Sequence, residues 1–252
     1  MEAVSVAVIT RNEGRNIREC LASVQWASEI VVVDRFSSDD TVEIAREMGA
    51  TVYQEEWHGY AQQKNLAMEK TRGAWILNLD ADERIPPPLR GEILETLPKA
   101  GDTVGYYIAR RNYFCGKWIR YGGWYPDYTL RLLRKGAGRF EERAVHEKLR
   151  VHGRTGRLEH PMEHYSYRSI SDYLERLDRY SALAALELKK GMVTASWAAL
   201  SLRPLFTFFK MYIMRRGFLD GREGFFLAVS YAYYTFLKYY RTTEAASGLS
   251  FD

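Results

Sequence analysis

Three acidic side chains, Asp80, Asp82 and Glu83, come directly after the mostly apolar run "WILNL". In an extended backbone, residues two apart point to the same side, so Asp80 and Asp82 can converge on one point. Two adjacent carboxylates repel each other unless a cation lies between them, and such oxygen ligands suit Mg²⁺ or Mn²⁺. The pattern indicates a divalent-cation site. Acids at this place can also cap the next helix or lie solvated on a loop, and a motif this short often occurs by chance.

The elements that must position these acids are strands and helices that alternate through the first hundred residues. Apolar runs that predict strands are each followed by a segment with helical spacing of its apolar residues. This alternation predicts an α/β fold with a mostly parallel, Rossmann-like sheet flanked by helices. In such a sheet, ligands bind at the carboxyl ends of the strands, where Thr10, Asp34 and Asp80 fall. The expected strands cover residues 4–10, 29–34, 50–54 and 74–80, and the expected helices residues 14–24, 37–49 and 59–73.

The second half of the chain has a different character. Residues 104–149 are irregular and aromatic, with strand-like stretches at 104–114 and 127–135, and residues 167–191 form a clear amphipathic pattern. The composition changes near residue 168. We therefore expect one domain over residues 1–168 and an amphipathic helical region over residues 169–252.

Several longer stretches extend the pattern around the acids. They are "VSVAVITRNEGRNIRECLASV", "EIVVVDRFSSDDTVEIAREMGA", "HGYAQQKNLAMEKTRGAWILNLDADERI" and "VHEKL". Together they resemble the family 2 glycosyltransferases, which have the GT-A fold, and most of all the branch with the bacterial lipopolysaccharide-core β-1,4-glucosyltransferases. The resemblance covers about residues 3–168. It implies a metal-dependent, inverting transfer of a sugar from a UDP-sugar donor to a lipid-linked saccharide acceptor such as the lipopolysaccharide inner core. Among UDP-sugars, the resemblance favours UDP-glucose.

The resemblance also implies roles on the donor side of the site. Thr10, Asn12 and Glu13 follow the first strand, where the family holds the nucleotide. Asp34 resembles the acid that hydrogen-bonds the base or the ribose. Lys64, in "QKN", stands where related enzymes place a cation near the diphosphate, although a lysine on a helix is equally consistent with a solvated face.

The metal, the base and the acceptor loop follow from the same resemblance. Asp80 and Asp82 resemble the Asp-x-Asp pair that binds the nucleotide-sugar and the divalent metal (Mn²⁺ or Mg²⁺), with Asp82 as the direct ligand. His164 resembles a late histidine that can complete the metal site; His160 is close enough to compete, and either can be a structural histidine. The resemblance implies that Glu147 is the catalytic base, with Asp127 as the second choice, and that Gly122, Gly123 and Trp124 form the acceptor loop. Glu147 can alternatively be a surface ion-pair partner of Lys148 or Arg150.

The tail, residues 196–241, is apolar and aromatic but is punctuated by Lys and Arg. Its longest uncharged apolar stretch, residues 225–237, has thirteen residues, fewer than the roughly 20 that a spanning helix needs. Aromatic helices with cationic flanks tend to lie in the interface of an anionic membrane surface. We therefore expect a membrane-associating extension, with peripheral or monotopic attachment to the cytoplasmic face of the inner membrane. The alternative is that these helices pack on the first domain or form a dimer interface.

The bulk properties limit the other classes of function. The net charge of +4 gives no argument for nucleic acid as a partner, and the two cysteines form neither a disulfide framework nor a metal spacing. Two rival hypotheses remain: a nucleotidyltransferase, and a non-catalytic adaptor at the membrane surface. UDP-galactose or UDP-N-acetylglucosamine as the donor, and a polyprenyl-linked saccharide or a protein as the acceptor, also remain open.

Overall fold

The computed structural model describes residues 2–141, 148–191 and 195–244 and divides the chain into two compact units. The first unit comprises Met1–Arg110 and Tyr128–His164, and the second comprises Arg111–Asp127 and Tyr165–Asp252. The expected domain boundary near residue 168 stays a prediction, because compactness alone does not show that a part of the chain folds independently.

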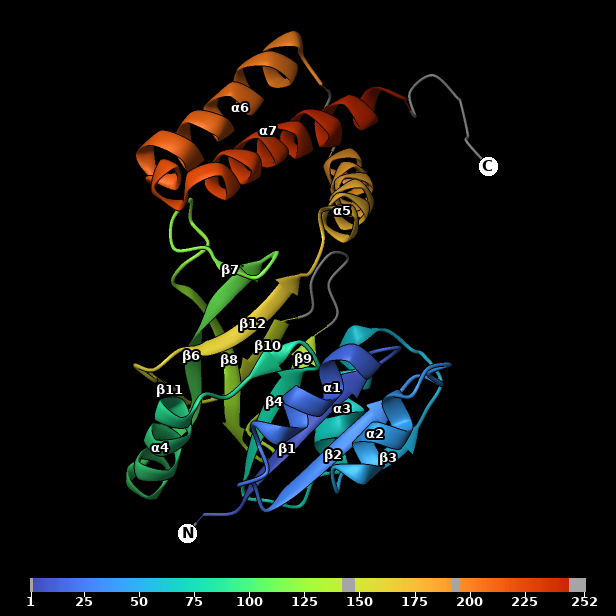
Figure 1. The fold of residues 1–252 in the computed structure, drawn as a ribbon, viewed down its shortest axis with the longest axis vertical. Coiled ribbons are helices and arrows are strands. Elements are labelled where there is room, and N and C mark those ends of the chain that lie inside the picture. The colour runs from blue at the N-terminus through green and yellow to red at the C-terminus, as the bar shows by residue number, and fades with distance from the viewer. Residues whose placement is uncertain (1, 142–147, 192–194, 245–252) are drawn as a thin grey trace. The chain divides into compact units, whose positions relative to one another are not determined.

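Four parallel strands form the centre of the first unit (Figure 1). Their apolar, β-branched sequences are almost entirely buried in the three strands β2, β1 and β4, as expected where helices cover both faces of a sheet. The predicted alternation of strands and helices is confirmed. The strands are β1 (Val4–Thr10), β2 (Glu29–Asp34), β3 (Thr51–Gln54) and β4 (Trp75–Asp80), and the connecting helices are α1 (Gly14–Ala22), α2 (Thr41–Glu47) and α3 (Tyr60–Glu69).

Alternate residues of these strands face two separate hydrophobic clusters. Val6 and Val8 of β1 pack with Ile17 of α1 on one face, whereas Ala7 packs with Met68 of α3 on the other. This alternation follows from the period of two residues in a strand. Each fully buried Val or Ile side chain contributes about 1.5–3 kcal/mol to stability, so both faces anchor the sheet that carries the strand ends.

The remaining strands of the first unit make the sheet mixed rather than parallel. Strand β8 (Asp127–Arg134) pairs antiparallel with β4, and the sheet order is β3-β2-β1-β4-β8-β6-β12-β5. The prediction of parallel pairing therefore holds for the first four strands only. The other elements are β5 (Glu83–Arg84), α4 (Pro87–Thr96), η1 (Leu97–Lys99), β6 (Thr103–Phe114), β11 (Arg154–Arg157), β12 (Met162–Tyr167) and a separate hairpin of β9 (Gly138–Glu141) and β10 (Lys148–Val151).

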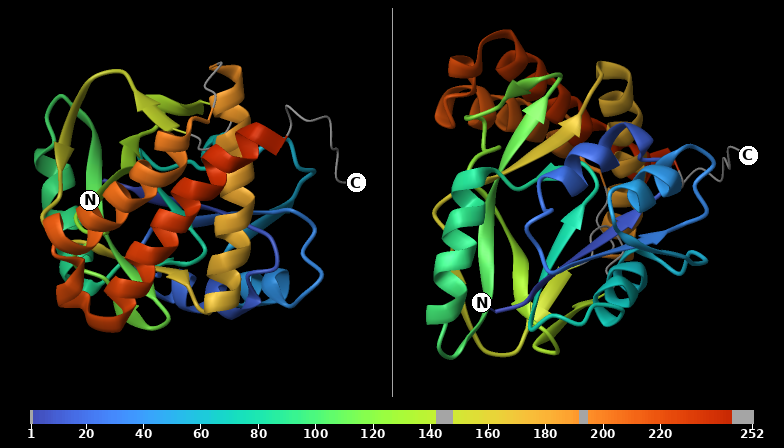
Figure 2. Two further views of the ribbon diagram at one scale, coloured as in Figure 1. Left: turned by 90° about the horizontal axis from the view of Figure 1, so that it is seen from above. Right: turned by 60° about the horizontal axis from the view of Figure 1, so that its bottom comes forward.

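The second unit is mostly helical, around an aromatic core. Phe114, Tyr173 and Phe226 meet with ring centroids 5.3–5.8 Å apart. Ser169 and Ser196 cap α5 and α6 by accepting hydrogen bonds from backbone N–H groups of the first turn. Helices α6 and α7 lie side by side (Figure 2). The elements are β7 (Lys117–Trp118), α5 (Ile170–Lys190), α6 (Trp197–Phe209), η2 (Lys210–Met214), η3 (Gly217–Asp220) and α7 (Gly221–Glu244).

Within the described residues, none of these helices combines the length and the apolarity that crossing a bilayer requires.

Candidate active site

The carboxyl ends of the parallel strands meet at one edge of the sheet. Thr10 is in register with Asp34, and Ile9 is in register with Asp80, so the expected strand-end residues become neighbours. The hydroxyl of Thr10 donates to Oδ1 of Asp34 over 2.9 Å, and the backbone N–H of Ser37 donates to Oδ2 over 2.8 Å. The carboxylate of Asp34 is fully buried, and its hydrogen bonds hold the loop after β2 in place.

The loop after β1 is tied to the loop after β2 through Asn12. The backbone N–H of Asn12 donates to Ser37 Oγ, and its side-chain oxygen accepts from the backbone N–H of Ser38, each over 2.8 Å. Asn12 has φ 54°, a conformation that asparagine tolerates better than most residues. Glu13 adds a third tie, since its backbone N–H donates to Thr41 Oγ1 over 2.8 Å. Hydrogen bonds therefore join the loops after β1 and β2 into one rim at the carboxyl ends of the strands.

Asp80 is held by two cations from different elements. Nζ of Lys64 in α3 lies 2.8 Å from Oδ1, and Nη2 of Arg131 in β8 lies 2.5 Å from Oδ2. Burial alone would raise the pKa of Asp80, but the charges of Arg131 and Lys64 outweigh it and hold that pKa well below its usual range. Asp80 is therefore ionised throughout the neutral range. Both of its carboxylate oxygens have a cation as partner.

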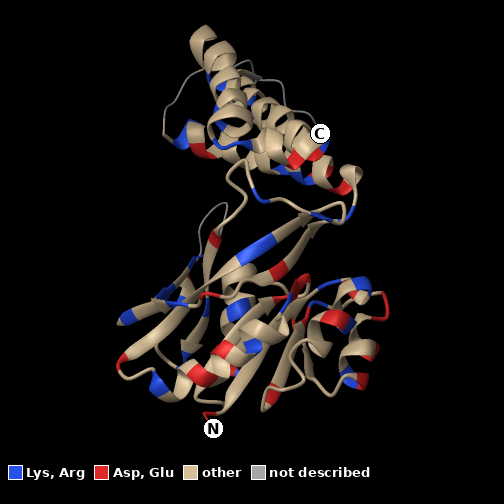
Figure 3. Ribbon diagram, turned by 60° about the vertical axis from the view of Figure 1, so that its left-hand side comes forward, with Lys and Arg blue, Asp and Glu red and all other residues tan. Residues whose placement is uncertain are grey.

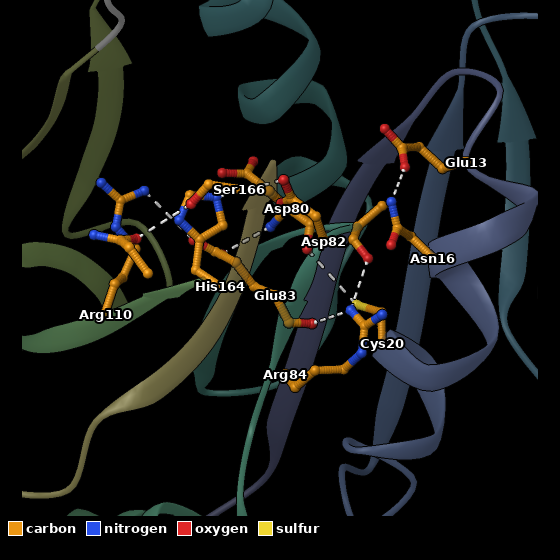
Figure 4. A network of polar contacts seen from close by, with 12 residues as sticks. Glu13, Asn16, Cys20, Asp80, Asp82, Glu83, Arg84, Arg110, His164 and Ser166 are labelled. Carbon is orange, nitrogen blue, oxygen red and sulfur yellow. Dashed lines mark hydrogen bonds and ion pairs between the residues drawn. The ribbon is translucent and has the colours of Figure 1, made fainter. Parts of the chain in front are cut away.

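Glu83 and Arg131 belong to the same network, although they were not among the candidates from the sequence (Figure 4 shows Glu83 with its neighbours). Nη2 of Arg131 lies 2.5 Å from Oε1 of Glu83, and the backbone N–H of Asp80 donates to Oε2 of Glu83 over 3.0 Å. Arg110 approaches the same carboxylate at 3.7 Å. The available signal was Arg131 itself, since it interrupts the apolar run from Leu130 to Leu133 of a strand.

Asp82 and His164 form a second polar pair near the end of β4 (Figure 4). Nε2 of His164 lies 3.4 Å from Oδ2 of Asp82 because β12 pairs antiparallel with the short strand β5, which follows Asp82. Both side chains stay partly accessible, at 16% for His164 and 19% for Asp82. This pair unites two residues that were expected to bind the metal.

Whether a divalent cation fits at Asp82 and His164 depends on the ligand atoms that these two side chains offer. A carboxylate oxygen and an imidazole nitrogen suit Mn²⁺, and Mg²⁺ or Mn²⁺ commonly takes its remaining ligands from water and substrate phosphates. In the part of the chain that the structure describes, no group of three or more His, Cys, Asp or Glu side chains could hold a metal by itself. Asp82 and His164 therefore fit a cation that shares its coordination with a diphosphate. Asp80 has a cation at each of its carboxylate oxygens, and its expected role as a second metal ligand stays a prediction.

The other candidate residues lie elsewhere. His160 is exposed and pairs with Glu92 of α4, with Nδ1 3.0 Å from the carboxylate. Asp127 accepts a hydrogen bond from Asn112 over 3.1 Å, within the second unit. Glu147 lies outside the described residues. The expected acceptor loop is also in the second unit: Gly122 and Gly123 both have positive φ, and Trp124 is buried in the aromatic core.

Comparison with known proteins decides the family. The sequence model described as Glycosyl transferase family 2 matches residues 5–157, which include every strand-end residue described above. The chain belongs to glycosyltransferase family 2. Two relatives match this family 2 chain over more than residues 5–157. The lipopolysaccharide core biosynthesis glycosyltransferase LpsC of Rhizobium meliloti is 30% identical, over 93% of this chain and 89% of the relative. An uncharacterized glycosyltransferase of Rickettsia felis is 30% identical, over 97% and 91%.

A solved structure of similar fold agrees with the GT-A architecture of this family 2 chain. TarS residues 1–349 of S. aureus, in complex with UDP-GlcNAc, superposes with a TM-score of 0.52 at 16% identity, over 99% of this chain and 93% of that chain. This likeness establishes the fold alone. The predicted fold class, a GT-A α/β sheet with C-terminal helices, is confirmed, and the expectation that the helices associate with a membrane stays a prediction.

Proposed function

We propose that this family 2 glycosyltransferase transfers a sugar from a UDP-sugar to a lipid-linked saccharide of the lipopolysaccharide core type, with inversion at the anomeric carbon. Glucose is the first candidate for the sugar. The observation that carries the donor side is the Asp82–His164 pair beside the braced strand ends at Thr10 and Asp34. Family membership supports the reaction class. The relative named for lipopolysaccharide core biosynthesis supports the acceptor class. The TarS structure holds UDP-GlcNAc on a similar fold, which makes uridine nucleotides the first donors to test.

The reaction is a single displacement at the anomeric carbon. The bond from the acceptor oxygen to this carbon forms as the bond to the diphosphate oxygen breaks, and the electron pair leaves with UDP. Asp82 and His164 would hold Mn²⁺ or Mg²⁺, which would supply Lewis-acid stabilisation of the charge on the diphosphate. Lys64 and Arg131 fix Asp80 at the strand end, two residues before the proposed metal ligand Asp82.

A carboxylate must take the proton of the acceptor hydroxyl. We assign this role to Glu147 and keep Asp127 as the second candidate. No covalent enzyme intermediate is needed, since base and leaving group act on opposite faces of the sugar. The proton moves from the acceptor oxygen to the carboxylate, and the nucleotide departs as the diphosphate.

A lipid-linked acceptor places the reaction at a membrane. We propose that the chain works at the cytoplasmic face of the inner membrane and attaches peripherally through its C-terminal helices. Many of the exposed large apolar side chains of the second unit lie on α6, η2 and η3, and an apolar surface of this extent needs a cover.

The test of the transfer reaction uses the purified full chain. UDP release is measured with UDP-glucose, UDP-galactose and UDP-GlcNAc, with Mn²⁺ and after chelation. Metal-dependent UDP release with a preference for UDP-glucose supports the proposal. Pyrophosphate release from a nucleoside triphosphate and a sugar phosphate would instead reveal a nucleotidyltransferase, and no turnover of any donor would favour the adaptor. Mass spectrometry of lipid glycans from a deletion strain then identifies the acceptor.

A further inference from the structure

The second unit contains a pocket of about 580 Å³, and the proposed transfer assigns no chemical step to its charged residues. Gly122, Gly123 and Trp124, the residues expected to form the acceptor loop, are among those that line it. It lies among α6, α7, η2 and the loop at Gly122, and every residue that lines it belongs to the second unit. Pockets that hold small organic ligands have volumes of about 300–1,000 Å³. The pocket is therefore large enough for a lipid headgroup or a comparable small molecule.

The charged residues of the pocket are all cations. Arg203, Lys210, Arg215 and Lys238 line it, and no acidic residue does. None of the four has a carboxylate within ion-pair distance among the described residues, whereas Arg241 and Arg176 of the same unit do. Figure 3 shows where Lys and Arg fall on the ribbon of these helices. Lys238 is partly buried and the other three cations are exposed, so solvent weakens their mutual repulsion and an anionic ligand would offset what remains.

Two of the cations share one aromatic ring. The guanidinium of Arg203 lies 4.8 Å from the ring centroid of Tyr239 and donates a hydrogen bond to its hydroxyl. The ammonium of Lys238 lies 5.3 Å from the same ring. Burial of Lys238, and then the charge of Arg203, lowers the pKa of the lysine. Two cations thus lie beside one aromatic ring, where they could contact the same anionic group.

Two threonine hydroxyl groups also border the pocket. Thr207 of α6 and Thr235 of α7 have their hydroxyl oxygens 3.3 Å apart, and each donates its hydrogen to the backbone carbonyl four residues earlier in its own helix. The binding of an anion in this pocket therefore depends on its Lys and Arg side chains, which bind phosphate oxygens by charge-assisted hydrogen bonds.

The edge of the pocket joins an exposed apolar surface. Leu202 and Phe206 line the pocket, yet they are 63% and 58% exposed. Further exposed apolar side chains lie on α6 and on η2, which follows it; they are Leu205, Phe209, Ile213 and Met214. A ligand with an anionic head and apolar chains matches both features, because the head meets the cations while the chains cover the apolar side chains.

We propose that this pocket binds the phosphate headgroup of an anionic phospholipid of the bilayer, with its acyl chains along the exposed apolar side chains of α6 and η2. The inference rests on the proposed membrane attachment but not on the transfer reaction. It differs from diffuse attraction to a charged surface, because one lipid binds at one place and only the pocket cations matter.

The test compares two double variants that remove the same charge. Arg203→Gln with Lys238→Gln empties the pocket of two cations, whereas the control, Arg216→Gln with Arg222→Gln, removes two exposed cations that do not line it. Binding of the full chain to phosphatidylcholine vesicles with and without phosphatidylglycerol is measured by flotation. The pocket variant should lose at least about twentyfold in affinity, since each hydrogen bond to a charged group contributes about tenfold or more, whereas the control should lose much less because its cations do not line the pocket. Equal losses of affinity in the two variants would contradict lipid binding in the pocket and favour diffuse attraction to the charged surface.

A second measurement identifies the occupant. Calorimetry with a short-chain phosphatidylglycerol below its micelle concentration should show one site in the wild type and the control, and none in the pocket variant. Equal binding of short-chain phosphatidylcholine, or of inorganic phosphate alone, would refute an anionic lipid as the ligand. Arg203→Lys keeps the charge and should retain binding, and thermal unfolding checks that each variant is folded. UDP release without lipid should be unchanged in the pocket variant, so its loss of lipid binding stays distinguishable from failure of the transfer reaction.

Discussion

Arg131 and Glu83 form an ion pair inside the first unit, with Nη2 2.5 Å from Oε1 and side-chain exposures of 4% and 0%. The same nitrogen also reaches Asp80, so one guanidinium connects β8 to Asp80 at the end of β4 and to Glu83 of β5. Buried charges of this kind depend on each other, because removal of one partner leaves the others uncompensated in a medium of low polarity.

Replacement of Arg131 by Met should therefore destabilise the fold. We expect the free energy of unfolding to fall by about 3–5 kcal/mol, since the fully buried charge of Glu83 loses its nearest partner, while Asp80, which is partly exposed, keeps Lys64. Urea denaturation measures the change. The control is Arg154→Met, which breaks an exposed pair with Asp102 and should cost less than about 1 kcal/mol. Similar losses in the two variants would show that the buried network is not what stabilises this edge.

The depressed pKa of Asp80 predicts a pH dependence of stability. A carboxyl whose folded pKa lies below its unfolded value contributes stability that is fully present above the unfolded pKa, about 3.9. That contribution is lost as the pH falls through the folded pKa. The free energy of unfolding should thus decline below about pH 4, and less steeply in Asp80→Asn than in the wild type. Urea titrations at a series of acidic pH values test this, and parallel curves would contradict it.

Asp82 and His164 should matter for the donor, and His160 should not. We expect Asp82→Ala and His164→Ala each to lower the rate of UDP release by about 10²-fold or more, because stabilisation of the leaving diphosphate is lost. His160→Ala removes a histidine of the same strand region that pairs with Glu92 instead, and it should keep near-normal turnover. If His160→Ala were the damaging substitution, the metal assignment would be wrong.

Glu147→Gln tests the proposed base. Donor binding should remain, while transfer to the acceptor falls by about 10²–10⁴-fold, the usual contribution of a positioned base. Asp127→Asn is the matched variant for the second candidate. Calorimetric donor binding and single-turnover transfer are measured for both. Near-wild-type transfer by Glu147→Gln, together with its loss in Asp127→Asn, would move the role to Asp127.

Gly123 and Gly91 should respond in opposite directions to alanine. Gly123 has φ 92°, and a Cβ there would lie 2.1 Å from Nη1 of Arg215, so we expect a loss of about 1–2 kcal/mol. Gly91 lies in α4 with nothing within 4 Å of an added Cβ, and alanine there should stabilise by about 0.5–1 kcal/mol. Chemical denaturation of both variants is the measurement. A neutral Gly123→Ala would mean that this turn can relax.

The strand ends could be predicted because their signals are local. Apolar, β-branched runs predicted β1, β2 and β4, and the rule for parallel sheets predicted that Thr10, Asp34 and Asp80 would meet. Both conclusions needed only the order of strands and helices along the chain. The resemblance to the family added the individual roles, of which the structure unites Asp82 with His164.

The partners of Asp80 could not be predicted in the same way. Arg131 reaches it only because β8 inserts antiparallel beside β4, with Leu132 opposite Leu77, and no local periodicity specifies a pairing 55 residues apart. The position of His160 has the same origin. Its backbone and ring bind Glu92, a contact between distant elements, so proximity to His164 in the sequence gave no guide.

The bridge that Asn12 makes between the loops after β1 and β2 confines the backbone of both loops. Binding then spends little conformational entropy on this rim, because the backbone is already confined. We expect a nucleotide that contacts these two loops to bind without a rearrangement of their backbone.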